Sequence, residues 1–119
     1  MQRILAIDAG SSAVKVIVAQ RSDAGAWNVS ARSSQQIPAP TSGADGTMEA
    51  NPKQWWEAVR AALDSLNAYL SVASIEAIAL SGQMQSVALL AHDGSPIRPA
   101  LLYSDSRAAA EAKTIEKIV

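Results

Sequence analysis

The sequence contains no cysteine, and it has no long hydrophobic run and no excess of charge of one sign. Without cysteine, neither disulfide bonds nor thiolate metal sites can form. No apolar run approaches the roughly 18 to 20 residues that a membrane-spanning helix needs. Ten basic residues against eleven acidic ones give a net charge of -1, which is not the charge pattern of a nucleic-acid-binding protein. The start, Met1-Gln2-Arg3 followed by few apolar residues, does not resemble a secretory signal. We therefore expect a cytoplasmic protein without a nucleic-acid or membrane partner.

The N-terminal third of the chain has the pattern of three strands. An apolar run over residues 4–7 ends at Asp8 and a Gly-Ser-Ser turn, and residues 14–19 supply a second apolar stretch. After a turn at residues 22–25, apolar and polar residues alternate from Trp27 to Arg32, which indicates a half-exposed strand. Two successive hairpins are predicted. With 49% hydrophobic residues, the 119-residue chain can form one globular domain with a core.

The rest of the chain predicts a surface loop, two helices and further strands. Prolines and glycines over residues 38–50 favour a loop. Asn51 suits an N-cap, Pro52 the first helical position and Gln54 a capping box, so a helix should begin there. Its expected buried face consists of Trp55, Val59, Ala62, Leu63, Leu66 and Leu70. A strand over 75–80, a hairpin over 86–91 and 97–103, and a helix from Ser106 to the last residue should follow. His92, the single histidine, falls in the hairpin turn, where we assign it no catalytic role.

The stretch Asp8-Ala9-Gly10-Ser11-Ser12-Ala13-Val14-Lys15 carries the clearest chemistry. Glycine lets the backbone approach a phosphate closely, and short hydroxyl side chains leave room for it. Asp8 could hold a magnesium ion or its waters beside the phosphates, and Lys15 could add positive charge. The alternative is an ordinary hairpin turn in which Asp8 caps backbone amides.

Four segments together resemble the FGGY carbohydrate kinase family, in particular its xylulokinase-like branch. Asp8-x-Gly10-Ser11-Ser12-x-x-Lys15 is similar to the family's first phosphate motif, with Ser11 in place of Thr. Glu49-x-Asn51-Pro52-x-x-Trp55-Trp56 is similar to its entry into the first helix. Gly82-Gln83-Met84-Gln85 and Tyr103-Ser104-Asp105-Ser106-Arg107 resemble two segments of its sugar pocket. The resemblance covers essentially the whole chain.

This resemblance implies an α/β fold of the ribonuclease-H-like kind found in the actin and hexokinase superfamily. Residues 1–119 would be an incomplete N-terminal part of the first domain, which binds sugar and holds the phosphate loop; the second, ATP-binding domain would be absent. The full-length protein would transfer the γ-phosphate of ATP, with Mg²⁺, to a hydroxyl of a sugar, with a pentulose such as D-xylulose as the leading substrate. The aspartate general base would lie beyond residue 119. We therefore expect this chain to be inactive by itself and to self-associate through apolar surface left exposed.

The resemblance also assigns site residues. The phosphate and ATP ligands would be Asp8, Gly10, Ser11, Ser12 and Lys15, with Asp8 also at the metal. The sugar-binding residues would be Gln83, Met84, Gln85, Tyr103, Asp105 and Arg107. Gln85 stands where the family usually has His, and Tyr103 where it has Trp. Glutamine can donate and accept hydrogen bonds but carries no proton-transfer group, so the sugar stays open.

Several alternatives remain at this point. Asp105 and Arg107 could cap the final helix and pair on the surface. The two adjacent tryptophans, Trp55 and Trp56, are expected to be packing residues rather than ligand contacts. The chain could be a free-standing α/β binding or assembly module instead of part of an enzyme. An acetate-kinase-like or pantothenate-kinase-like enzyme would share the phosphate loop, but the Trp-Trp and Gly-Gln-Met segments argue against it.

Overall fold

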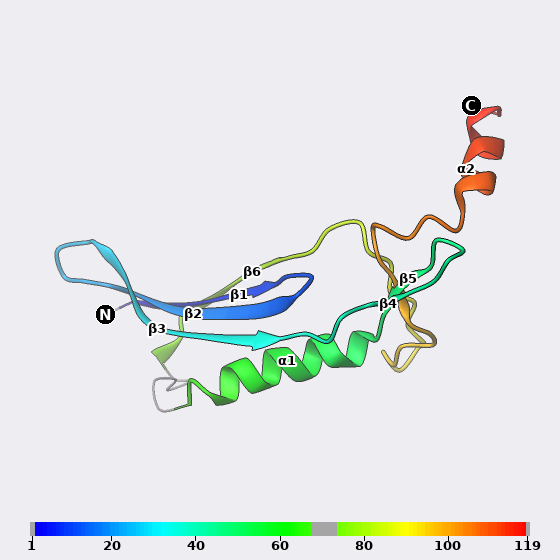
Figure 1. Cartoon of the computed structure of the whole chain (residues 1–119). Coiled ribbons are helices and arrows are strands. Elements are labelled where there is room, and N and C mark those ends of the chain that lie inside the picture. Colours follow the sequence, from blue (N-terminus) through cyan, green and yellow to red (C-terminus); the bar gives the residue numbers. More distant parts are fainter. Residues whose placement is uncertain (1, 68–73, 119) are drawn as a thin grey trace. The chain divides into compact units, whose positions relative to one another are not determined.

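The structure is a computed structural model that describes residues 2–67 and 74–118 (Figure 1). The chain forms two compact units, each built from two separate stretches of sequence. The first unit comprises Met1–Pro38 and Lys53–Gln83, and the second comprises Ala39–Pro52 and Met84–Val119. Leu70, predicted to face the core, lies outside the described residues. The predicted mixed α/β class is confirmed.

The first unit contains a four-stranded sheet in the order β3-β2-β1-β6. Its strands are β1 (Arg3–Ala9), β2 (Ala13–Arg21), β3 (Trp27–Gln36) and β6 (Ala77–Gly82). The first three are antiparallel neighbours, so both predicted hairpins are confirmed. Helix α1 (Pro52–Asp64) begins at the predicted proline and precedes β6, which runs parallel to β1. A parallel neighbour requires such a crossover connection, because a tight turn would reverse the chain.

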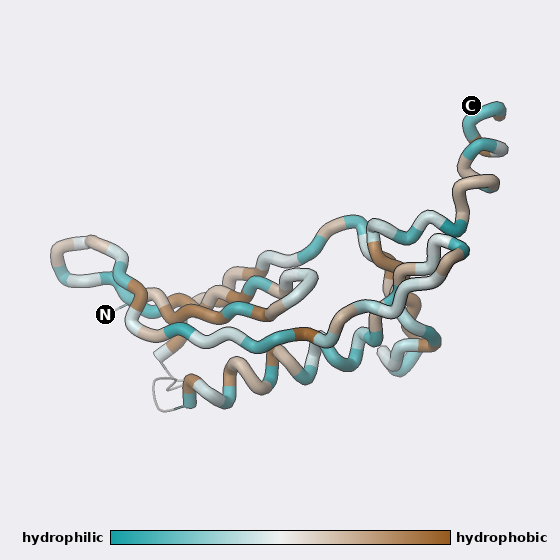
Figure 2. Tube along the Cα trace, viewed as in Figure 1, coloured by the Kyte–Doolittle hydropathy of each residue, from teal (hydrophilic) through white to brown (hydrophobic). Residues whose placement is uncertain are grey.

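The core of the first unit lies between one face of the sheet and α1. Alternate residues Val14, Val16 and Val18 of β2 are fully buried, and hydrophobic colour follows β1 and β2 in Figure 2. Ala62 of α1 and Leu66, which lies in the turn just after the helix, are buried as predicted. The other predicted helix residues, Trp55, Val59 and Leu63, are partly buried and pack against this core. Ala58 is buried too, although the predicted face did not include it.

Trp56 corrects the expectation that both tryptophans are packing residues. Its exposed fraction is 62%, whereas Trp55 is partly buried against the core. Adjacent residues of a helix point about 100° apart, so one helix cannot direct both side chains at the same sheet. Within the described residues, Trp56 is a surface side chain.

Strand β6 carries apolar side chains that nothing in the described part of the chain covers. All six of its residues are exposed. Ile78 pairs with the buried Leu5 of β1, and Leu80 pairs with Ile7, so both lie on the core face of the sheet. Their exposed fractions are nevertheless 62% and 77%. Helix α1 therefore covers the β1 side of this face and leaves the β6 side open.

The second unit contains a three-stranded sheet in the order β4-β5-β7. Its strands are β4 (Thr41–Ser42), β5 (Met48–Ala50) and β7 (Ala100–Leu101). The prediction of a loop over residues 38–50 is therefore wrong, because β4 and β5 form a small hairpin there. Its turn is closed by a hydrogen bond from the Gly46 N–H to the Gly43 carbonyl, and Gly46 has a φ of 88° that favours glycine.

Two further predictions for the second unit need correction. The turn over residues 92–95 is confirmed by the hydrogen bond from the Ala91 N–H to the Ser95 carbonyl. However, the predicted hairpin is reduced to isolated bridges at Val87–Leu101 and Leu90–Pro96, and Leu101 also pairs with Glu49 of β5. Helix α2 (Ala109–Glu116) ends before the last residue rather than at it. Neither described helix combines the length and apolarity needed to cross a bilayer.

Candidate functional site

Asp8 lies near the end of β1, between side chains of both neighbouring strands. It pairs with Lys15 of β2 and with Ser81 of β6, so the three side chains share one level and one face of the sheet. Buried Val14 and Val16 flank Lys15 along β2, which places this row on the face away from α1. Asp8 and Lys15 are exposed. The sheet thus presents a carboxylate and a cation together at one edge.

The predicted phosphate turn joins β1 to β2. The Gly10 N–H donates to the Ala13 carbonyl at 3.1 Å, and a Cβ added to Gly10 would lie only 3.0 Å from that oxygen. This close approach explains the glycine. The Ser12 carbonyl accepts a hydrogen bond from the Ile37 N–H at 2.9 Å. The Gly10 N–H is engaged in this hydrogen bond within the turn. The groups that a ligand can reach are therefore those of the exposed residues Ser11 and Ser12.

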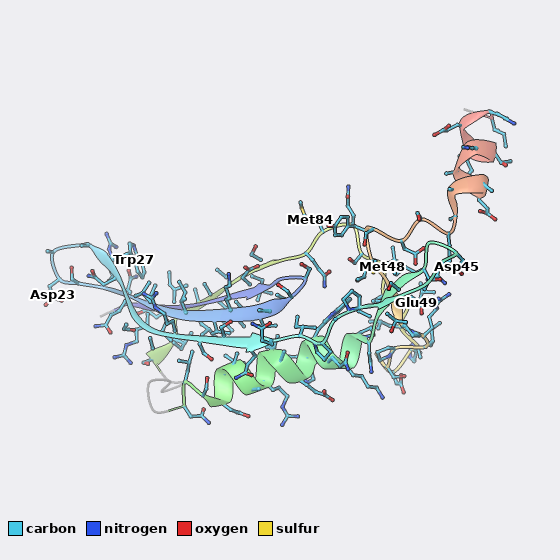
Figure 3. All side chains as sticks on the ribbon, viewed as in Figure 1. Asp23, Trp27, Asp45, Met48, Glu49 and Met84 are labelled. Carbon is cyan, nitrogen blue, oxygen red and sulfur yellow. The ribbon has the colours of Figure 1, made fainter. Side chains whose placement is uncertain are left out.

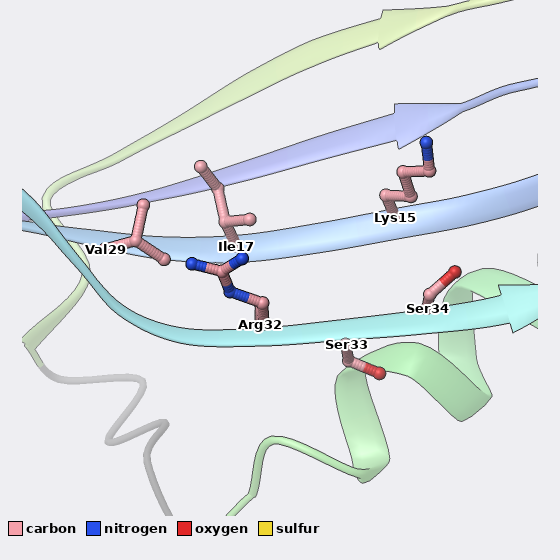
Figure 4. A pocket seen from close by; sticks show the side chains of 6 residues that line it. All are labelled: Lys15, Ile17, Val29, Arg32, Ser33 and Ser34. Atoms are coloured by element: carbon pink, nitrogen blue, oxygen red, sulfur yellow. The ribbon is translucent and has the colours of Figure 1, made fainter.

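Lys15 also lines a depression on the outer face of β2 and β3 (Figure 4). The residues that line it are Lys15, Ile17, Val29, Arg32, Ser33 and Ser34. Lys15 and Arg32 reach this surface from neighbouring strands, and both are exposed. The outer face beside Asp8 is therefore positively charged, which suits an anionic group.

Gln83 follows β6 at the same sheet edge as the phosphate turn. Its N–H donates to the Ala9 carbonyl at 3.0 Å, and a Cβ added to Gly82 would lie 3.0 Å from that oxygen. The carboxyl ends of β1 and β6 therefore meet there. In open α/β sheets, ligands bind outside the carboxyl ends of the strands. The first unit thus brings Asp8, the turn and Gln83 to one edge.

The other predicted sugar-pocket residues belong to the second unit. Met84 and Tyr103 are exposed by 80% and 66%. Gln85 has a φ of 60°, and among the described residues it is the one non-glycine residue with a positive φ. Such backbone conformations are uncommon outside glycine and gather at functional sites. Sequence reasoning singled out Gln85 for its side chain and had no signal for its backbone.

Asp105 and Arg107 are held in a network with Glu49 of β5. Figure 3 labels Glu49 and its neighbour Met48 on this strand. The Asp105 Oδ2 atom accepts from the Met48 N–H at 2.8 Å and from the Arg107 Nη2 group at 2.5 Å. The same Arg107 nitrogen donates to Glu49 Oε1 at 2.7 Å, and Arg98 also contacts that oxygen. We call these the Glu49–Arg107–Asp105 network. The pairing alternative is confirmed, whereas the capping alternative is wrong, because α2 has Ala108 at its N-cap and no side-chain cap.

The network shifts the pKa values of all three groups. Hydrogen bonds from the Arg107 guanidinium, then from the Met48 N–H, hold the pKa of Asp105 well below its usual range. Hydrogen bonding to Arg107 likewise lowers the pKa of Glu49. The Asp105 and Glu49 carboxylates raise the pKa of Arg107 above its ordinary value. All three groups are therefore charged at neutral pH.

We expect the stability of the chain to fall as the pH drops below about 4.5. The ordinary pKa values are 3.8 for Asp105 and 4.5 for Glu49, and both are lower in the folded chain. The unfolded chain therefore binds more protons in this range, so the stabilisation is complete above these values and is lost on acidification. Urea unfolding at stepped pH, followed by circular dichroism, measures the slope. Asp105→Asn should flatten it and Glu111→Gln, exposed on α2, should not; an unchanged slope in Asp105→Asn would contradict the assignment.

Glu49 is the member of this network to which the sequence analysis assigned no role. It stands in the Glu-x-Asn-Pro motif, and that motif by itself indicates only the start of a helix. Its partner Arg107 is far along the chain, and nothing in the sequence pattern connects the two. The structure joins them because β5 lies beside the segment that follows β7.

Comparison with known proteins places the chain among sugar kinases. Residues 3–119 match the model of the FGGY family of carbohydrate kinases, N-terminal domain. Xylulose kinase of Staphylococcus xylosus is 31% identical over 117 residues, which cover 98% of this chain and 23% of that protein. Xylulose kinase of Streptomyces coelicolor is 32% identical over 112 residues, or 94% of this chain and 22% of that protein.

A solved structure agrees with these sequence matches. The crystal structure of xylulose kinase from Rhodospirillum rubrum superposes with a TM-score of 0.83 at 26% identity, covering 99% of this chain and 24% of that one. The chain thus spans less than a quarter of the length of these relatives. The likeness in sequence and in fold extends over nearly all of the present residues, and the predicted actin and hexokinase type of fold is confirmed. The chain belongs to the FGGY family of carbohydrate kinases, within the family's N-terminal domain.

Proposed function

We propose that this chain is the sugar-binding, phosphate-loop part of an ATP-dependent sugar kinase that phosphorylates a hydroxyl of a pentulose such as D-xylulose. The observation that carries the proposal is the meeting of Asp8, the Gly10–Ser12 turn and Gln83 at the carboxyl edge of one sheet. The similarity to proteins named xylulose kinase supports the substrate class. The proposed kinase also has a second domain, outside residues 1–119, which holds most of the ATP site.

The residues at the phosphate turn fit ATP and magnesium. Asp8 is an exposed carboxylate, and the described residues hold no group of three or more potential metal-ligating side chains. This suits Mg²⁺, which keeps several waters and binds through few carboxylates together with phosphate oxygens. The ion would neutralise negative charge on the phosphoryl group as it is transferred. Ser11 and Ser12 would donate hydrogen bonds to phosphate oxygens, and Lys15 would add a positive charge.

Sugar recognition is assigned to Gln83, Met84, Gln85 and to the segment from Tyr103 to Arg107. Gln85 keeps a donor and an acceptor for sugar hydroxyls where the family usually has His. Exposed Tyr103 offers a ring face and a hydroxyl. Neither glutamine is a general base, so deprotonation of the attacking hydroxyl is assigned to an aspartate outside residues 1–119.

The proposal also covers the cellular compartment of the protein and its binding partners. The balanced charge and the lack of a long apolar helix among the described residues support a cytoplasmic enzyme without nucleic-acid or membrane partners. The uncovered side chains of Ile78 and Leu80 on β6 support self-association of the 119-residue chain. Exposed strand edges with apolar residues commonly pair with other chains.

The test is an assay of the full product of the natural gene with ATP against a panel of ketoses, polyols and sugar acids. We expect ATP-dependent phosphorylation of a pentulose, detected as ADP release and as a sugar phosphate by mass spectrometry. A product that phosphorylates a polyol or a sugar acid instead would keep the kinase and replace the substrate. A product that phosphorylates none of them would favour a binding or assembly module.

A further inference from the structure

We propose that Glu49 is a positioning residue that, through Arg107, fixes the Tyr103–Arg107 segment in the conformation that receives the sugar. This inference rests on the proposed function and adds to it a residue that makes no sugar contact. It starts from the hydrogen bonds that connect β5 to the candidate sugar-binding segment within the second unit.

The backbone of the segment is tied to the β5 hairpin at both ends. The Leu102 N–H donates to the Met48 carbonyl at 3.0 Å, and the Ser106 N–H donates to the Gly46 carbonyl at 2.9 Å. A Cβ added to Gly46 would lie 3.2 Å from the Arg107 nitrogen, so the two stretches are in close contact. Leu102 and Ser106 bracket Tyr103, whose position therefore depends on the β5 hairpin.

Side chains complete the attachment. Asp105 spans from its own segment to the Met48 N–H, and its side chain is only 7% exposed. Its Oδ1 atom accepts from the Arg107 N–H at 3.2 Å and from the Arg107 Nε–H at 3.0 Å. Both carboxylate oxygens are thus engaged within the protein. Tyr103, at 66% exposure, is the largest of the exposed side chains that the segment offers to a ligand.

Glu49 is the anchor of this arrangement because it belongs to β5 and not to the segment. Its side chain is 17% exposed, and its Oε1 atom holds Arg107 at 2.7 Å while also contacting Arg98. Charge-assisted hydrogen bonds of this kind are stronger than neutral ones and fix orientation. Without Glu49, the hydrogen bonds described for the Arg107 side chain would all go to Asp105 in its own segment. The guanidinium would then no longer be hydrogen-bonded to β5.

Arg98 provides a matched control, since it pairs with the same carboxylate oxygen. Its side chain is 41% exposed, and it precedes β7 rather than belonging to the Tyr103–Arg107 segment. Loss of Arg98 removes an ion pair from Glu49 but leaves the link from Glu49 to Arg107 in place. The two arginines therefore separate a general loss of charge pairing from a loss of positioning.

The experiment uses the full-length protein and measures KM for the phosphorylated sugar, KM for ATP and kcat. Glu49→Ala should raise the sugar KM about tenfold, as expected when a site residue is misplaced, with kcat and the ATP KM changed less than about twofold. Glu49→Gln, which keeps an acceptor oxygen, should restore part of the loss, and Arg98→Gln should leave the sugar KM unchanged. Hydrogen exchange should show faster exchange at the Asp105 to Arg107 amides in Glu49→Ala.

The outcomes separate this inference from the function on which it rests. A sugar KM that stays within twofold in Glu49→Ala, or that rises equally in Arg98→Gln, overturns the positioning role while the kinase stands. A wild-type protein that phosphorylates no sugar overturns the kinase proposal and the positioning role with it. If Glu49→Ala does not fold, the comparison of Glu49→Gln with Arg98→Gln decides by the same criterion.

Discussion

Replacing Asp8 with asparagine in the full-length protein should lower kcat for sugar phosphorylation by a factor on the order of 10² to 10³. The substitution keeps the shape of the side chain and removes its charge, so a magnesium ion beside the phosphates would lose its carboxylate partner. Asp8 is exposed and lies beyond the buried part of β1, so the fold should tolerate asparagine. The KM for the sugar should change little, because the residues proposed to bind the sugar are untouched.

Asp23→Asn is the control for this prediction. Asp23 is also exposed, but it lies in the turn between β2 and β3, at the opposite end of the hairpin from the phosphate turn. Steady-state kinetics with saturating ATP and magnesium, together with a thermal unfolding curve for each variant, provide the measurement. A kcat for Asp8→Asn within threefold of wild type would return Asp8 to the alternative of a simple turn residue.

Leu5→Ala should lower the free energy of unfolding of the 119-residue chain by about 2 to 5 kcal/mol. Leu5 is 7% exposed and lies on the sheet face that packs against α1. Its removal takes a large side chain from a core whose largest fully buried members are three valines, Val14, Val16 and Val18. Small domains are stable by only about 5 to 15 kcal/mol, so this is a large part of the total.

Leu80→Ala is the matched control, because Leu80 lies on the same face of the sheet but is 77% exposed. At protein concentrations where the chain is a monomer, we expect it to change the unfolding free energy by less than about 0.5 kcal/mol, as is usual for surface positions. Urea unfolding followed by circular dichroism at several protein concentrations measures both variants and detects self-association. Equal losses of unfolding free energy in Leu5→Ala and Leu80→Ala would show that β6 is covered in solution. The core would then extend beyond the part of the sheet that α1 covers.

The elements that the sequence predicted correctly have strong local signals. The two hairpins carry turn residues between apolar runs, and α1 starts at the proline that follows Asn51, a residue type favoured at N-caps. Strand β6 was predicted two residues early, over 75–80, because apolar Ile75 lies just before its apolar run with only Glu76 between them. Periodicity finds such elements because each is long enough to repeat its pattern.

The missed features depend on contacts between distant parts of the chain. Strands β4 and β5 contain two and three residues, too few to show alternation, and β5 is a strand because it lies between β4 and β7. The Glu49–Arg107–Asp105 network joins side chains that are 58 residues apart at its widest link. Only the candidate phosphate turn, being contiguous, could be located from sequence; the arrangement of the candidate sugar-binding segment could not.

The interleaving of the two units has a consequence for synthesis on the ribosome. The inner strand β1 can pair with β2 once residue 21 has emerged, but its other neighbour, β6, is made only after the whole of α1. By then the β4–β5 hairpin of the second unit has already emerged and must wait for β7. A nascent chain that has reached Gln83 therefore holds every residue of the first unit but only residues 39–52 of the second. Translation order thus favours closing the first unit before the second, and neither unit can be obtained by a single cut of the chain.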